Sequence, residues 1–252
     1  MITLQTITTI ELASICNLEC AYCISRLLQD EPVRRPGLMS DDVFKAACDV
    51  LQKLCDQGTQ REINLNGNGE PLLDYKLIQR IKTVREIVGP DRHIGLSTNG
   101  MLITKSIAKE LASSGLTQLD ISPHQPYYAR KAAYIMHGAG MKKGQVSFGC
   151  IIMSHNWAGQ LEPEHQIKCE LKINCDPLIE GRGYVLSEGN ITPCCYDYRN
   201  LGVFGTVFDD DILDRPIKPY ELCHSCHQQI PPFICAENDF IQFPQEEIEV
   251  CV

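Results

Sequence analysis

Three cysteines stand close together near the N-terminus in a C-x3-C-x2-C pattern, at Cys16, Cys20 and Cys23. Three thiolates at this spacing can ligate three irons of one iron–sulfur cubane. The fourth iron then lacks a protein ligand and can bind a substrate or cofactor, like the open position of a catalytic metal site. A zinc site or a group of buried thiols is the alternative, and the aromatic Tyr22 directly before Cys23 favours the cluster.

The elements that position this loop follow a regular alternation. The β-branched segment 5–14 is expected to form a buried strand that leads into the loop. Further strands are expected at 61–71, 93–100, 117–124 and 145–153. A helix is expected to start at Ser40, and others to span 74–88, 104–114 and 126–137, because their apolar residues recur at helical spacing. The alternation predicts an α/β fold with parallel strands and right-handed crossovers.

Polar and glycine-rich segments follow several of these strands. The cysteine loop follows the first strand, GNGEP (67–71) the second, STNG (97–100) the third and SPH (122–124) the fourth. In parallel α/β folds the chemistry lies at the carboxyl ends of the strands. We therefore expect the four segments to meet at one rim of the sheet.

After about residue 156 the alternation ends. One more strand is expected at 169–175, then a hairpin over 181–195 that turns at Glu188-Gly189-Asn190. A short helix is expected around 209–214. We expect a core over 1–156 or to about 174, a small module over 175–235 with a β-hairpin and a helix, and an acidic tail over 236–252.

Composition excludes several classes of protein. The net charge of −9 disfavours binding to nucleic acid, which needs a basic surface. Arg34-Arg35 is the one basic candidate in the first half, and we expect it in a solvated loop. No apolar stretch is long enough to cross a membrane, and no secretory signal is recognised. The 14 cysteines therefore indicate metal or iron–sulfur binding in a cytoplasmic protein rather than disulfides.

The cysteine pattern after the first strand, with an aromatic before its last cysteine, resembles the radical S-adenosylmethionine (SAM) superfamily. The resemblance implies a partial (β/α) barrel that holds a [4Fe-4S] cluster and SAM, with Tyr22 beside the bound nucleoside. GNGEP resembles the motif that binds the SAM amino group, which implicates Gly67, Asn68, Gly69 and Glu70, although Asn68 stands where a glycine is usual. Ser97, Asn99, Ser122 and Ile151 occupy places where the family contacts the ribose, carboxylate or adenine of SAM.

The C-terminal cysteines resemble the auxiliary-cluster module called twitch, a short form of SPASM. The pattern is C-x13-G-x4-C from Cys175 to Cys194, followed by the pair Cys223 and Cys226. The resemblance implies that these four ligate a second, closed [4Fe-4S] cluster suited to electron transfer. Cys195 is an alternative ligand to Cys194. Structural zinc is the alternative metal, because four thiolates in two pairs also suit it.

The layout is similar to that of radical SAM dehydrogenases that act on aminocyclitols. This implies hydrogen abstraction from a small polar substrate, such as an aminocyclitol or aminosugar, with the second cluster as electron acceptor. An external one-electron donor of the flavodoxin or ferredoxin type is implied as a partner. The alternatives are radical modification of a peptide, a sugar epimerase with Cys169 or Cys235 as hydrogen donor, and a non-catalytic carrier with two clusters.

Overall fold

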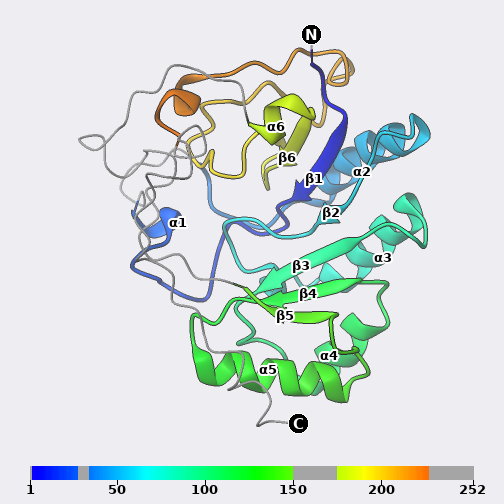
Figure 1. Cartoon of the computed structure of the whole chain (residues 1–252), viewed down its shortest axis with the longest axis vertical. Coiled ribbons are helices and arrows are strands. Elements are labelled where there is room, and N and C mark those ends of the chain that lie inside the picture. Colours follow the sequence, from blue (N-terminus) through cyan, green and yellow to red (C-terminus); the bar gives the residue numbers. More distant parts are fainter. Residues whose placement is uncertain (1, 28–33, 150–174, 227–252) are drawn as a thin grey trace.

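The computed structural model describes residues 2–27, 34–149 and 175–226. In these ranges one sheet of eight strands has the order β5-β4-β3-β2-β1-β6-β7-β8. The strands are β1 (Thr6–Ile10), β2 (Ile63–Asn64), β3 (Ile94–Thr98), β4 (Gln118–Ile121), β5 (Val146–Phe148), β6 (Arg182–Val185), β7 (Asn190–Thr192) and β8 (Gly205–Thr206). The first five run parallel to one another. The expected α/β class with parallel strands is therefore confirmed (Figure 1).

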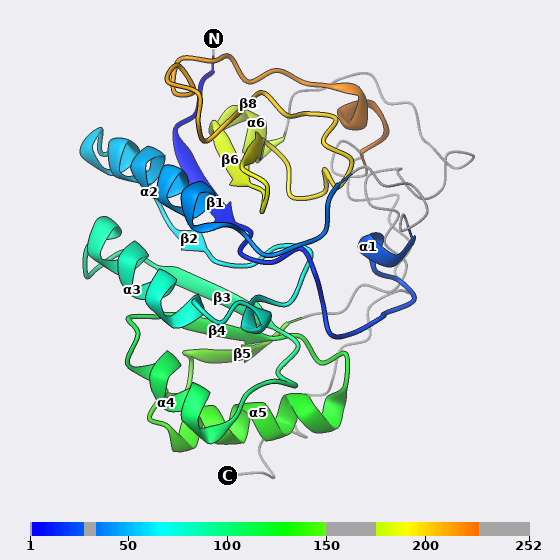
Figure 2. The ribbon, with the colours of Figure 1, turned by 180° about the vertical axis from the view of Figure 1, so that it is seen from behind.

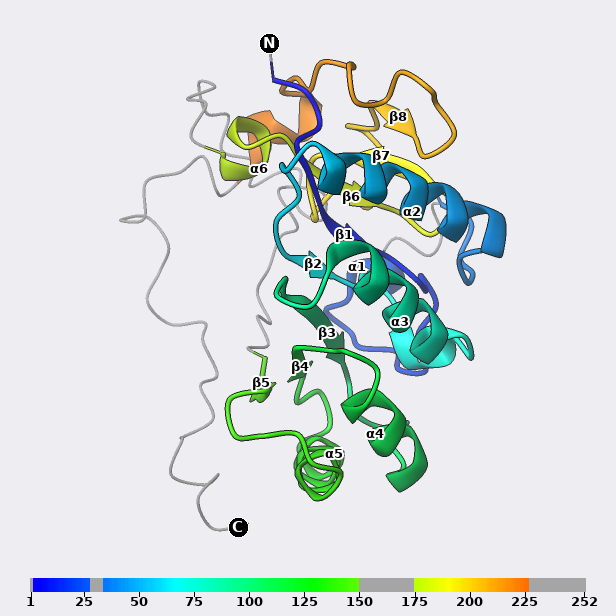
Figure 3. The same cartoon turned by 90° about the vertical axis from the view of Figure 1, so that its right-hand side faces the viewer.

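Helices cover one face of the parallel strands (Figure 3). They are α2 (Asp41–Asp56), α3 (Leu77–Val88), α4 (Lys105–Ala112) and α5 (Pro126–Gly138), while α1 (Ile24–Leu27), α6 (Asp176–Ile179) and the 3-10 helices η1 (Pro71–Leu73) and η4 (Glu221–Ser225) are short. Ser40 caps α2 as expected, since its hydroxyl accepts a hydrogen bond from the backbone N–H of Val43. The apolar stripe of α2 packs into the main hydrophobic core together with β1, β2 and β3.

Strands β1, β2, β3 and β4 run parallel, so the segments that follow them all leave the sheet at the same edge, as the alternation predicts (Figure 2). The second strand is much shorter than the expected 61–71, because pairing with β3 stops at Asn64. The residues after it form the turn and η1. This early end frees the backbone of the glycine-rich turn for other contacts.

The predicted hairpin is present, but it is joined to the main sheet. Strand β6 pairs parallel with β1, from Thr6 opposite Arg182 to Ile10 opposite Val185, and then antiparallel with β7. Gly189 supplies the turn, with a φ of +97° that favours glycine. The boundary between a core and a module at 175 remains a prediction.

The prediction of a short helix around 209–214 is wrong, since residues 210–214 form turns. The Asp209 carboxylate accepts a hydrogen bond from the backbone N–H of Thr206 and pairs with Arg215. Such side-chain bonds to the backbone compete with a helix.

Parts of several predictions lie outside the described residues, namely the end of the strand expected at 145–153, nearly all of the one at 169–175, Ile151, Cys169, Cys235 and the tail. Among the described helices, none has the length and apolar character needed to span a bilayer.

Candidate active site

The cysteine loop leads from the end of β1 to α1, which starts directly after Cys23. Cys16 is exposed, and Cys20 and Cys23 are partly buried. Neighbouring residues hold two of the sulfurs by hydrogen bonds. The backbone N–H of Leu18 lies 3.4 Å from the sulfur of Cys16, and the Cys23 sulfur is 3.0 Å from the Ser25 hydroxyl. The three thiols are therefore held at the surface of the rim and not in the core.

A pocket joins this loop to the turns after β2, β3 and β4. Its lining consists of Cys16, Leu18, Cys20, Tyr22, Cys23, Gly67, Asn68, Gly69, Glu70, Ser97, Thr98, Asn99, Ser122 and His124. Apart from Ile151, which is not described, the structure thus brings together every residue that the sequence assigned to the first cluster and to SAM. Which of them touch a ligand stays a prediction.

The glycines of the turn are required by the chain's own packing. A Cβ atom on Gly69 would lie 2.5 Å from the carbonyl oxygen of Ile15, and one on Gly67 would lie 2.6 Å from a carboxylate oxygen of Glu11. The backbone N–H of Glu70 also donates to the Ile15 carbonyl, at 2.8 Å. The turn therefore packs closely against residues 11–15, the segment that leads from β1 into the cysteine loop.

Substitution of Gly69 by alanine is expected to destabilise the protein by about 1–3 kcal/mol, because the new methyl group meets rigid backbone and not a movable side chain. The same change should lower the iron retained by the cysteine loop. Gly37→Ala is the matched control, since nothing lies within 4 Å of a Cβ atom there. Thermal unfolding and iron content measure both effects, and equal behaviour of the two variants would contradict the close packing.

Glu70 ties two of the rim turns together. One carboxylate oxygen accepts hydrogen bonds from the Thr98 hydroxyl at 2.7 Å and the Leu72 backbone at 3.0 Å, and the other accepts one from the Asn99 backbone at 2.8 Å. Burial raises the pKa of Glu70 above its usual value, although these donors act to lower it. The second oxygen accepts only this one hydrogen bond among the described residues. Glu70 lines the pocket, so its carboxylate suits an ammonium group bound there.

Asn99 connects the third turn to the cysteine loop. Its side-chain amide donates to the Asn17 side chain at 2.8 Å and lies 3.8 Å from the Cys16 sulfur. Its oxygen accepts from the Met101 backbone at 3.0 Å, which fixes the orientation of the amide. Asn99 is buried, so this donor is held against the first cysteine.

His124 is a pocket residue that the sequence did not single out. Its ring nitrogen Nδ1 lies 2.6 Å from the Tyr22 hydroxyl, and the two rings stack with centroids 5.8 Å apart. Burial lowers the pKa of His124. The segment SPH was expected at this rim, and its place directly after a parallel strand is the signal in the sequence for His124. Thr98, within STNG, and Leu18, within the cysteine loop, also line the pocket and were not predicted as site residues.

The C-terminal cysteines also gather. Burial raises the pKa of Cys175 and Cys223, backbone hydrogen bonds lower it, and the charge of neighbouring Cys194 raises it again. The neighbouring thiol of Cys194 lowers the pKa of Cys195, whereas burial and the charge of Cys226 raise it. The four predicted ligands and Cys195 thus belong to one group of thiols.

Tyr220 packs into this thiol group from two sides. It joins Cys226 and Leu222 in one small cluster and Cys223 and Cys175 in another. Its hydroxyl is buried near the Cys194 thiol, yet it makes no hydrogen bond of ordinary geometry with any described residue. A buried donor without a partner calls for an explanation, and an iron–sulfur cluster with its thiolate ligands would supply the acceptor.

Among the described residues, no three Cys, His, Asp or Glu side chains converge in the geometry of a single metal ion. A cubane differs, because each thiolate binds an iron of its own. The common pocket of the three loop thiols and the unpartnered Tyr220 hydroxyl beside the second group both fit such clusters.

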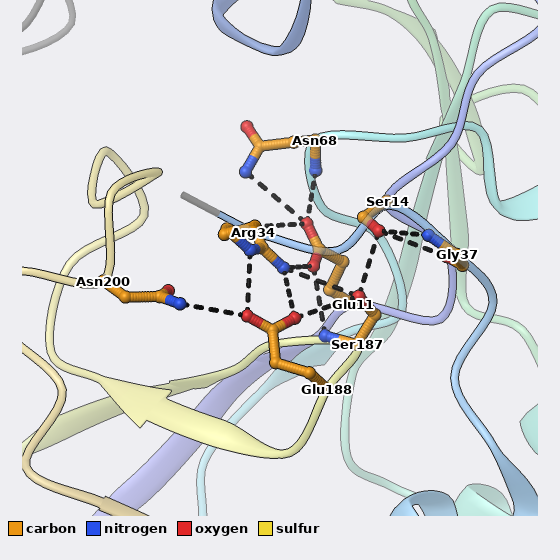
Figure 4. Close-up of polar contacts among 8 residues, drawn as sticks. All are labelled: Glu11, Ser14, Arg34, Gly37, Asn68, Ser187, Glu188 and Asn200. Carbon is orange, nitrogen blue, oxygen red and sulfur yellow. Dashed lines mark hydrogen bonds and ion pairs between the residues drawn. The ribbon is translucent and has the colours of Figure 1, made fainter. Parts of the chain in front are cut away.

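Arg34 corrects an expectation from the sequence. Arg35 is exposed as predicted, but Arg34 is buried, with 1% of its side chain accessible. Its guanidinium pairs with the carboxylates of Glu11 and Glu188, and Glu11 in turn contacts Asn68 of the glycine-rich turn (Figure 4). Sequence reasoning missed Glu11 as well, although a carboxylate at the end of a buried strand requires a partner.

Comparison with known proteins identifies relatives of this fold. A model described as the radical SAM superfamily matches residues 10–138, slightly more than half of the chain. A tungsten-containing aldehyde ferredoxin oxidoreductase cofactor-modifying protein of Pyrococcus furiosus is 33% identical over 107 residues, which are 42% of this chain and 27% of that protein. The chain thus spans about a quarter of that relative's length.

A longer match is the S-adenosyl-L-methionine-dependent 2-deoxy-scyllo-inosamine dehydrogenase of Niallia circulans, 24% identical over 209 residues, which are 81% of this chain and 79% of that protein. Among solved structures, BtrN in complex with AdoMet and 2-DOIA has a TM-score of 0.63 and 20% identity, with 83% of this chain and 82% of that chain covered. Streptococcus suis SuiB bound to precursor peptide SuiA has a TM-score of 0.55 and 14% identity, with coverage of 85% and 64%. These likenesses establish the fold.

Proposed function

The chain belongs to the radical SAM superfamily, and we propose that it cleaves SAM reductively in the pocket described above. The observation that carries the proposal is the lining of that pocket, where the three cysteines, the turn ending in Glu70 and the side chain of Asn99 meet. Cys16, Cys20 and Cys23 would ligate three irons of a [4Fe-4S] cluster and leave the fourth for SAM. Cluster and SAM, when bound, supply a 5′-deoxyadenosyl radical that abstracts a hydrogen atom from the substrate.

The residues of the rim have distinct parts in this proposal. Glu70 receives the SAM ammonium while it holds the turns after β2 and β3 in place. Asn99 fixes the start of the cysteine loop through its bond to Asn17. Tyr22, braced by His124, borders the place of the nucleoside, and the hydroxyls of Ser97 and Ser122 are expected to reach its ribose. Ile151 lies outside the described residues, and its contact with the adenine remains a prediction.

The second group of thiols is proposed to bind an auxiliary [4Fe-4S] cluster through Cys175, Cys194, Cys223 and Cys226. The buried hydroxyl of Tyr220 beside Cys194 supports this assignment, with Cys195 as the alternative ligand to Cys194. Structural zinc at the same four thiols is the competing assignment.

For the reaction, we propose the dehydrogenation of a small polar substrate, an aminocyclitol or aminosugar. Oxidation of its alcohol to a ketone requires loss of a hydrogen atom to the radical, of a proton from the hydroxyl, and of one electron, which the auxiliary cluster would accept. An external one-electron donor of the flavodoxin or ferredoxin type would reduce the SAM-binding cluster. The match to the dehydrogenase of Niallia circulans over most of the chain supports this substrate class.

Radical modification of a peptide is the second candidate, supported by the fold shared with SuiB, whose structure holds a precursor peptide. A sugar epimerase would need a hydrogen donor, for which Cys169 and Cys235 lie outside the described residues. A non-catalytic electron carrier has no use for a SAM pocket, so the lining of the pocket disfavours it.

The test uses the anaerobically reconstituted protein with dithionite and SAM. We expect 5′-deoxyadenosine and, when 2-deoxy-scyllo-inosamine is added, an equal amount of the ketone. Deuterium placed at the carbinol carbon should appear in the 5′-deoxyadenosine. Cleavage of SAM without any ketone would refute the dehydrogenase assignment and leave peptide modification or epimerisation, whereas absence of 5′-deoxyadenosine from protein with intact clusters would refute the radical chemistry.

A further inference from the structure

The carboxylate of Glu11 supports the glycine-rich turn from behind. Glu11 directly follows β1 and is buried. One of its oxygens accepts a hydrogen bond from the backbone N–H of Asn68 at 2.9 Å and is 3.5 Å from the Asn68 side-chain amide. Gly67 leaves the room for this approach, since a Cβ atom there would overlap the Glu11 side chain. The middle of the turn is therefore placed by a side chain that does not line the pocket.

The same carboxylate reaches the hairpin in the opposite direction. Its other oxygen accepts from the backbone N–H of Ser187 at 3.1 Å and pairs with Arg34. Arg34 in turn donates to both oxygens of Glu188, at 3.0 and 2.8 Å. Figure 4 shows the guanidinium lying between the two carboxylates. A continuous chain of hydrogen bonds thus runs from Glu188 through Arg34 and Glu11 to Asn68.

In this hydrogen-bonded network each buried charge is neutralised by its neighbour. Glu11 and Arg34 have 2% and 1% of their side chains exposed, so neither charge is solvated by water. Burial raises the pKa of Glu188, but the hydrogen bond and charge of Arg34 outweigh it and hold the pKa below its ordinary value. Glu188 also accepts from Asn200 at 3.2 Å, which anchors its free side.

We propose that Glu188 is a positioning residue for the SAM site, and that it sets the backbone of Asn68 through Arg34 and Glu11. The inference rests on the proposed function, because it takes the pocket beside Asn68 to be the SAM pocket. It connects the hairpin turn, which precedes Cys194 by six positions in the chain, to the cofactor site on the opposite side of β1. Linkage then requires that SAM binding in turn stabilises the hairpin turn.

The test measures SAM affinity of the full-length, anaerobically reconstituted protein by equilibrium dialysis. Glu188→Gln keeps the shape of the side chain and removes the charge, and we expect it to weaken SAM binding about tenfold. The control is Glu180→Gln at the other end of β6. Glu180 is exposed to a similar extent, 29% against 26%, and also pairs with an arginine, Arg182 at 2.7 Å. We expect SAM affinity of this variant to match the wild type.

Two further measurements separate positioning from loss of structure. Iron content should be the same in both variants, while the change that SAM causes in the electron paramagnetic resonance spectrum of the reduced cluster should be diminished in Glu188→Gln alone. Asn200→Gly removes the milder support of Glu188 and keeps the left-handed φ of 59° at that position, and a smaller loss of affinity is expected.

The possible outcomes are distinct. Unchanged SAM affinity in Glu188→Gln, or an equal loss in Glu180→Gln, overturns the inference while the proposed function stands. If Glu188→Gln fails to fold, full affinity in Asn200→Gly overturns it. Wild-type protein that carries its clusters but binds no SAM overturns the proposed function itself.

Discussion

Replacement of Cys16, Cys20 and Cys23 by alanine is expected to abolish 5′-deoxyadenosine formation and to lower the bound iron from about eight to about four atoms per chain. The three thiols share one pocket with the turns that are proposed to hold SAM. Without them the cofactor has neither its open iron nor an electron source. Iron and zinc analysis after reconstitution, with chromatography of the nucleoside product, measures both effects.

The C-terminal thiols provide the contrasting variant. Replacement of Cys175, Cys194, Cys223 and Cys226 by alanine should also remove about four irons, but it should leave SAM cleavage in place and end substrate oxidation. Cys55→Ala on α2 is the control, because this half-buried thiol belongs to neither group and should leave the iron content unchanged. Wild-type protein with about four irons and one zinc would show that the second group is a zinc site.

Much of this arrangement was open to prediction because its causes are local. The spacing in the cysteine loop, the cap at Ser40 and the turn at Gly189 each depend on a few neighbouring residues. The convergence of the loop with GNGEP, STNG and SPH follows from one further rule, that parallel strands end at one edge. The pocket therefore contains the predicted residues, and His124 with them.

The remainder depends on contacts between distant segments. Nothing near Arg34 in the sequence shows that it is neutralised by Glu11, 23 residues before it, and by Glu188, 154 residues after it. The parallel pairing of β6 with β1 is likewise invisible locally, because a hairpin predicts its own antiparallel partner and not the strand it joins. Gly67 was assigned to SAM binding, and the structure shows that the absence of a side chain there also makes room for Glu11.

Substitution of Arg34 by methionine is expected to destabilise the protein by about 3–5 kcal/mol, because it leaves the buried Glu11 carboxylate without its counter-charge. For a chain of this length the loss corresponds to a fall of roughly 6–20 °C in the midpoint of thermal unfolding. The control is Arg61→Met, which breaks a pair with Glu180 whose arginine is 64% exposed. Surface pairs contribute about 0–1 kcal/mol, so this variant should unfold close to the wild-type temperature.

The double variant Glu11→Gln and Arg34→Met tests the cause. If the cost arises from an uncompensated charge, neutralising Glu11 as well should recover much of it, because a buried ion pair replaced as a whole is often nearly neutral. The glutamine oxygen can still accept from the backbone of Asn68, so the turn keeps this hydrogen bond, whereas the bond from the Ser187 backbone to the other oxygen is lost. Additive losses in the double variant would mean that Arg34 acts through packing, for instance over the ring of Tyr198 at 5.5 Å, and that its charge is not what holds the network together.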